Sequence, residues 1–139
     1  MNQEILEQTL RTIQAEHPDG DKGLIVMWVS RLIEDAGEER LAERLDEAIS
    51  HTWPWKVVAV LYEILSWWTS DEGSALLRTT ESWLREGTNL RRIQIALAQD
   101  TYPFIEAAEM YQVLEMVAQR FPEVADQCAY LINSRKRRD

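Results

Sequence analysis

Only two side chains in this sequence are suited to proton transfer near neutral pH, those of His17 and His51. Histidine serves in such chemistry because its ordinary pKa lies close to neutrality. The two histidines fall in separate loop-like segments, and a zinc site made by them with Asp19 or Asp21 lacks the ligand spacing of a structural zinc motif. We therefore expect solvent-exposed loop histidines and no bound metal.

The common motifs of small enzymes are missing as well. The chain contains no GxxxxGK[ST] phosphate loop and no GxGxxG, HExxH, CxxC or GxSxG motif. Its single cysteine, Cys128, lies on the apolar stripe of the last expected helix, where a buried thiol is usually unreactive. These absences favour a protein that is not an enzyme and that carries no cofactor.

Glu63 is the one carboxylate inside the most apolar segment, residues 57–68. A carboxylate on the narrow polar stripe of a core helix can be partly desolvated, which raises its pKa. Hydrolytic acid–base chemistry would need a second carboxylate facing it, such as Asp71 or Glu109. One possible function is therefore that of a helical enzyme or small-ligand-binding protein, with a pocket around Glu63 and the tryptophans of this helix. We keep it as the alternative to the protein-binding function derived below.

The densest charge lies in residues 34–47, where seven acidic side chains accompany two arginines. Glu39, Glu43 and Glu47 follow the i, i+4, i+8 spacing of one helix face, on which like charges repel one another. Pairs between Arg40 and Glu43 and between Arg44 and Glu47 would make this an ordinary solvated face. The functional interpretation is a docking surface for a basic partner protein.

Four of the six tryptophans flank the apolar segment. Trp67 and Trp68 stand at positions compatible with the core, which predicts that residues 57–68 form a central helix surrounded by others. Trp53 and Trp55 lie in an entry loop, where their rings either plug the helix end or anchor a partner. The candidate partner-binding residues are accordingly Glu39, Glu43, Glu47, Trp53 and Trp55.

The elements that position these residues are helices throughout. Apolar side chains recur at helical spacing, no segment alternates with a period of two, and glycine, proline and capping residues separate the segments. The expected helices cover residues 2–16, 24–37, 38–50, 54–68, 74–87, 90–99, 104–121 and 123–134. The apolar run at 57–68 is too short to span a membrane, which needs about 20 apolar residues. The predicted fold class is therefore all-α.

The chain has the length of one ordinary domain, with 139 residues of which 45% are hydrophobic. We expect a single compact helical domain over residues 1–134 and a basic C-terminal tail over residues 135–139. Alternate helix breaks lie about 34 residues apart, so a pair of helices recurs with that period. This spacing fits antiparallel hairpins in a compact bundle as well as a short right-handed repeat-like stack.

The net charge of the chain is −9. The segment 135–139 carries four bases and one acid, so the remainder has a net charge of −12. Such an acidic body repels nucleic acid and anionic lipid, and it favours a basic protein as partner. The N-terminus lacks the pattern of a secretory signal, so we expect a cytosolic protein.

Together these features predict a small acidic protein-binding module that associates non-covalently with a basic partner protein. Inhibitors, immunity-type neutralisers, antitoxins, chaperones and adaptors all act in this way, and composition selects none of them. A homodimer formed through an apolar patch on the last two helices is a further alternative.

Overall fold

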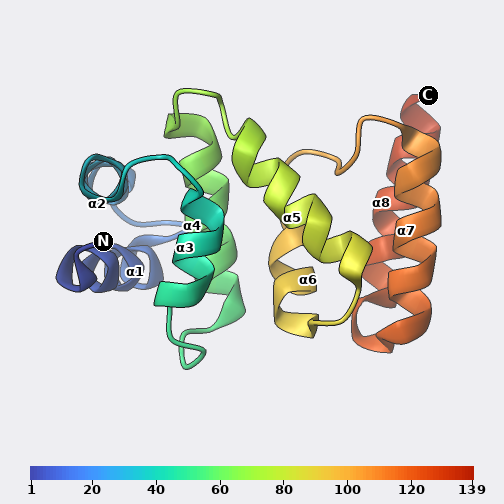
Figure 1. Ribbon diagram of the computed structural model, residues 1–139, viewed down its shortest axis with the longest axis horizontal. Helices are drawn as coiled ribbons and strands as arrows, with labels where there is room; N and C mark the ends of the chain where they lie inside the picture. The colour runs from blue at the N-terminus through green and yellow to red at the C-terminus, as the bar shows by residue number, and fades with distance from the viewer. The chain divides into compact units, whose positions relative to one another are not determined.

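The computed structural model describes every residue from 1 to 139, and its regular structure is helical (Figure 1). Eight α-helices and one short 3₁₀ helix follow one another without a strand, which confirms the predicted all-α class. The elements are α1 (Gln3–Glu16), α2 (Lys22–Ala36), α3 (Leu41–Ala48), α4 (Trp55–Trp68), α5 (Ser74–Glu86), α6 (Leu90–Leu97), α7 (Ala107–Arg120), η1 (Pro122–Val124) and α8 (Ala125–Arg138).

The chain divides into two compact units, with the boundary inside α5. Unit 1 covers residues 1–77 and unit 2 covers residues 78–139. Each unit packs helix on helix, and each is described separately below. The expectation of one domain over residues 1–134 stays a prediction.

Unit 1 is built on the apolar stripes of α1, α2 and α4. Leu6, Leu10 and Ile13 recur at i, i+4 and i+7 on α1 and are almost completely buried. The helices α1 and α2 form a closely packed pair, and α4 contacts both of them. From α4, Leu61 and Leu65 enter this core, as the periodicity of the segment predicts. No helix of the protein has the length and hydropathy needed to cross a membrane.

Unit 2 is organised by the hairpin of α7 and α8, which are joined through η1 (Figure 1). Its core gathers buried side chains from α5, α6, α7 and α8 together with Phe104 from the α6–α7 loop. Cys128 lies in this core with no exposed surface, so the predicted burial of the only cysteine is confirmed. Burial raises the pKa of the Cys128 thiol to about 11.

The α6–α7 loop differs from the sequence-based expectation. A helix is predicted to begin at residue 104, but α7 begins at Ala107. Phe104 has a φ of 67°, in the left-handed region that non-glycine residues rarely adopt. Its ring is buried, and the guanidinium of Arg85 lies 4.8 Å from the ring centroid. Burial of this ring helps to offset the cost of the backbone conformation.

The expected basic tail is also different, because α8 continues to Arg138. Arg135 continues the stripe of Cys128 and Ile132 at i+7 and i+3. Its guanidinium donates to the carbonyl oxygens of Pro103, Phe104 and Ile105, at 3.1, 2.8 and 2.8 Å. These hydrogen bonds hold the helical end against the α6–α7 loop and explain why residues 135–138 do not form a separate tail.

Candidate functional site

The three predicted acidic residues do not share one helix face. The helix α3 begins at Leu41, and Arg40 before it has a left-handed φ of 51°, so Glu39 lies outside the helix. The expected alignment of Glu39 with Glu43 and Glu47 is therefore wrong. Its physical cause is the turn after α2, where the guanidinium of Arg44 binds three main-chain carbonyl oxygens. These belong to Ala36, Gly37 and Glu39, at 2.8, 3.1 and 2.9 Å.

Arginine neutralises only part of this acidic segment. The predicted pair of Arg40 and Glu43 is confirmed, with Nε and Oε2 3.1 Å apart. The predicted pair of Arg44 and Glu47 is wrong, since Arg44 binds carbonyl oxygens instead. Glu39 and Glu47 are exposed and have no ion pair. Two of the three candidate carboxylates therefore keep a solvent-facing charge.

The exposed tryptophans are found at the opposite end of α4 from the predicted one. Trp53 and Trp55 are half-buried, whereas Trp67 is 71% exposed and Trp68 is 53% exposed. The expectation that Trp67 and Trp68 belong to the core is therefore wrong. The buried face of α4 ends with Leu65, and the last turn of the helix carries its two large rings into solvent.

The two rings border an apolar hollow of about 190 Å³ within unit 1. We call it the tryptophan hollow, and its walls are almost wholly apolar. Residues from the end of α1, the first half of α2 and the last half of α4 line it: His17, Lys22, Ile25, Val26, Ile64, Trp67 and Trp68. Met27, the next residue on α2, is 39% exposed. The hollow thus lies within an exposed apolar surface, which in a folded protein commonly marks an interaction site.

Acidic residues follow the hollow along the chain. Two residues after Trp68, the main-chain N–H and the hydroxyl of Ser70 both donate to Glu38, each at 2.9 Å. Asp71 comes next, and its carboxylate accepts from the N–H of Ala75 at 2.9 Å. This hydrogen bond is the main reason that the pKa of Asp71 lies below its ordinary value. Glu72 is exposed. The segment that follows Trp68 along the chain therefore carries negative charge.

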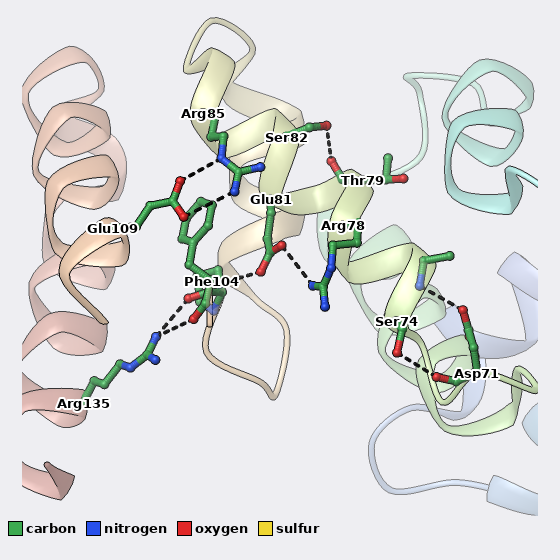
Figure 2. A network of polar contacts seen from close by, with 12 residues as sticks. Asp71, Ser74, Arg78, Thr79, Glu81, Ser82, Arg85, Phe104, Glu109 and Arg135 are labelled. Atoms are coloured by element: carbon green, nitrogen blue, oxygen red, sulfur yellow. Dashed lines mark hydrogen bonds and ion pairs between the residues drawn. The ribbon is translucent and has the colours of Figure 1, made fainter. Parts of the chain in front are cut away.

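The two carboxylates considered as partners of Glu63 in the alternative function both bind other groups. Glu63 is half-buried on α4. Asp71 is engaged at the start of α5, and Glu109 forms an ion pair with Arg85, with Oε2 and Nε 3.0 Å apart (Figure 2). Both proposed partners of Glu63 thus have other roles. Neither the tryptophan hollow nor the cleft of unit 2 described below includes Glu63 in its lining.

Several charged side chains of unit 2 belong to a network of polar contacts around Glu81, which the sequence pattern does not predict (Figure 2). Glu81 is only 3% exposed, and its carboxylate accepts from the main-chain N–H of Phe104 and from Arg78. A signal for this burial is present in the sequence, because Glu81 stands between Leu77 and Leu84 at i+4 and i+7 of an apolar stripe. Periodicity therefore marks the position of Glu81, but it does not identify the hydrogen-bond partners.

A second cavity, a polar cleft of about 470 Å³, lies between the α6–α7 loop and α8. Its wall includes Tyr102, whose hydroxyl is hydrogen-bonded to that of Ser134. The pKa of Tyr102 lies below its ordinary value, mainly because of this hydrogen bond. The side chain of Gln127 donates to the carbonyl oxygen of Leu97 at 3.4 Å, which ties the two walls together.

Comparisons with protein-family models, with curated proteins and with solved structures find no match to this chain.

The histidines lie apart from any metal-binding arrangement. Both are exposed, as expected, and His17 is part of the lining of the tryptophan hollow. No group of three or more histidine, cysteine, aspartate or glutamate side chains in the structure is arranged to hold a metal ion. The exposed tryptophan pair, the hollow and the acidic segments of unit 1 are therefore the features from which we argue a function.

Proposed function

We propose that this protein acts by binding a basic partner protein through unit 1, without catalysing a reaction itself. The observation that carries the proposal is the combination, in one unit, of excess negative charge and two adjacent exposed tryptophans. Inhibitors, neutralisers, antitoxins, chaperones and adaptors share this mode of action. The proposal concerns that shared mode.

The charge of the chain is concentrated in unit 1. Residues 1–77 contain 15 acidic and 6 basic side chains, a net charge of −9, whereas residues 78–139 contain 9 of each. An excess of one sign attracts partners of opposite charge and speeds their association. It supports a basic protein as the partner and unit 1 as the part that attracts it.

The tryptophan pair supplies the apolar component of the proposed interface. Tryptophan is enriched among the residues whose truncation most weakens protein complexes, because a large ring buries much surface on binding. Trp67 and Trp68 replace Trp53 and Trp55 as the aromatic anchors in the proposal, since the latter are half-buried. Glu39 and Glu47 remain candidate charged contacts because they are exposed.

The proposal is tested by affinity capture from the source cell at low and high salt, followed by titration calorimetry with the purified captured protein. We expect a basic protein whose affinity falls with salt, because exposed charges are screened. Reversing Glu39, Glu43 and Glu47 to lysine should weaken binding by about tenfold or more. Replacing Trp67 and Trp68 by alanine should weaken it by at least a similar factor.

A matched control is available in unit 2, where Glu115, Glu123 and Asp126 are also exposed. Reversing these three charges changes the net charge by the same amount and should leave affinity nearly unchanged. If both triple variants lose affinity equally, only the overall charge matters and unit 1 is not the binding part. If no protein is retained at either salt concentration, the proposed function is refuted.

A further inference from the structure

We infer that the tryptophan hollow is the site where the partner inserts one uncharged aromatic or large aliphatic side chain, carried by a basic segment. This inference rests on the proposed function. It adds the location of the anchor, the chemical class of the anchoring side chain and the charge of the residues that flank it.

The size of the hollow fits a single side chain. Its volume of about 190 Å³ is somewhat larger than an apolar cavity of about 150 Å³ that takes up benzene. Sites for whole drug-sized ligands or cofactors usually measure about 300–1,000 Å³. The hollow therefore has room for the ring of phenylalanine or the branched end of leucine, but it is small for a cofactor.

The chemistry of the walls selects an uncharged group. Ile25, Val26 and Ile64 offer no hydrogen-bonding side chain, so a charged or amide group placed there would lose its hydration without compensation. Lys22 is the one charged residue of the lining, and its ammonium group repels a second cation. An uncharged side chain is therefore favoured over a lysine or arginine in the hollow itself.

The exposed rings explain why occupation would be favourable. Trp67 and Trp68 present large apolar faces to water beside the hollow, and an apolar side chain entering it removes both its own surface and part of theirs from solvent. Because the hollow is already formed by helical residues, little ordering is needed on the side of this protein.

Charge complementarity determines what flanks the anchor. Asp19 is exposed in the loop between His17 and Lys22, and Glu72 is exposed four residues after Trp68. The two chain segments that border the hollow thus each bring an exposed carboxylate. Basic residues on either side of the anchoring side chain would meet these charges, which favours a basic segment over an acidic one.

The inference is tested with three probes, the N-acetyl amides of phenylalanine, leucine and lysine, added to the full chain and followed by NMR. We expect saturable shifts of the indole signals of Trp67 and Trp68 with the phenylalanine and leucine probes. The lysine probe should cause no such shift. If the lysine probe shifts these signals as strongly, or if the apolar probes shift none of them, the inference is refuted.

Two matched variants show whether the probes enter the hollow. Val26→Phe fills the hollow from α2, whereas Val57→Phe makes the same change at a half-buried valine outside the lining. We expect probe binding to be lost in Val26→Phe and retained in Val57→Phe. Circular dichroism checks that both variants fold, and if Val26→Phe does not, Ile64→Phe at another lining residue serves in its place. Unchanged probe binding in the folded filling variant would overturn the inference.

The affinity of the variants for the partner protein distinguishes failure of this inference from failure of the proposed function. Filling the hollow should weaken partner binding by about tenfold or more, as removal of an interface anchor does. If Val26→Phe leaves partner affinity unchanged while the charge reversal in unit 1 lowers it, the proposed function stands and the hollow is not the anchor site. If the indole signals of the free protein shift with its own concentration, the occupant is a second copy and the inference is refuted.

Discussion

Units 1 and 2 are both built from short amphipathic helices, yet they differ in the balance of their acidic and basic side chains. Unit 1 has nine more acidic than basic side chains, and it leaves Glu39 and Glu47 in solvent without an ion pair. Unit 2 has equal numbers of each, buries Glu81, and uses two of its arginines to bind main-chain carbonyl oxygens. Arg120 there donates to the carbonyl oxygens of Glu86 and Gly87, and Arg135 binds the α6–α7 loop.

A charged side chain can stabilise the fold or remain available to bind a partner, depending on whether it has a partner within the protein. A charge that binds a main-chain group or a buried carboxylate contributes to folding, because its removal leaves a polar partner unsatisfied. A charge left in solvent adds little to stability and remains available to a partner. On this comparison, substitutions in the unit 2 network should affect folding, whereas substitutions on the exposed surface of unit 1 should affect binding.

The largest expected effect concerns the reactivity of Cys128, which reports on whether unit 2 stays closed. The thiol is buried, its pKa is raised to about 11, and only the thiolate reacts rapidly with alkylating reagents. We expect alkylation at least about a thousandfold slower in the folded protein than in denaturant, because the reaction requires opening of the core. Mass spectrometry measures the rate.

The same raised pKa predicts a pH dependence of stability. Since the folded-state pKa is above the ordinary value of 9.0, the neutral thiol stabilises the folded state fully below that pH. This contribution is lost as the pH rises from 9.0 toward about 11, and Cys128→Ala should remove this part of the pH dependence of stability.

For the alkylation experiment, a folded protein that reacts as fast as the unfolded chain would contradict a closed core in unit 2.

The next largest effect is expected at Glu81. Glu81→Ala leaves the N–H of Phe104 without its carboxylate acceptor and should lower the free energy of unfolding by about 3 kcal/mol. Glu115→Ala removes an exposed glutamate and should change it by less than about 0.5 kcal/mol. Urea unfolding followed by circular dichroism measures both. Equal small losses would remove the distinction between internal and external charges in unit 2.

A smaller effect is expected at the end of α8. Arg135→Ala removes hydrogen bonds to three carbonyl oxygens and should lower the free energy of unfolding by about 2 kcal/mol. Arg137→Ala, an exposed neighbour on the same helical turn, should cost less than about 0.5 kcal/mol. The pair of variants is compared by thermal unfolding. If both arginines behave alike, the loop contacts of Arg135 do not contribute measurably to stability.

The smallest changes in stability are expected at the exposed tryptophans of unit 1. Trp67→Ala should alter the free energy of unfolding by less than about 0.5 kcal/mol, because most of its ring is already in water. Trp55→Ala, at the half-buried start of the same helix, should cost about 1 kcal/mol through lost apolar contact. Urea unfolding compares the two variants. A larger loss for Trp67→Ala would assign that ring to the fold instead of to recognition.

Part of the candidate site was accessible from local pattern. The periodicity of apolar residues predicts the number and order of the eight α-helices, the burial of Leu61 and Leu65, and the inward position of Cys128. The pair of Arg40 and Glu43 follows from i, i+3 spacing alone. Glu81 and Arg135 also stand on apolar stripes, so periodicity identifies both positions as unusual without naming their partners.

The position of the exposed aromatic surface could not be derived in this way. Residues 53–68 carry large apolar side chains at both ends, and a pattern that is apolar on most sides fits a fully surrounded helix as well as one with an open last turn. The start of α3 at Leu41, instead of at residue 38, could not be predicted for a related reason. It depends on the contacts of Arg44 with carbonyl oxygens up to eight residues away, which compete with helix formation at Glu39.

The helical class and the apolar stripes therefore follow from the sequence alone. So do the net negative charge of the chain and its densest part in residues 34–47. These properties follow from side-chain chemistry at fixed spacing along one helix. The exposure of Trp67 and Trp68 beside a hollow depends instead on the tertiary structure, as does the binding of Arg135 to a loop about thirty residues away. Exposure and hydrogen bonding depend on which distant segments pack against a side chain, and the spacing of residues along one helix does not specify those segments.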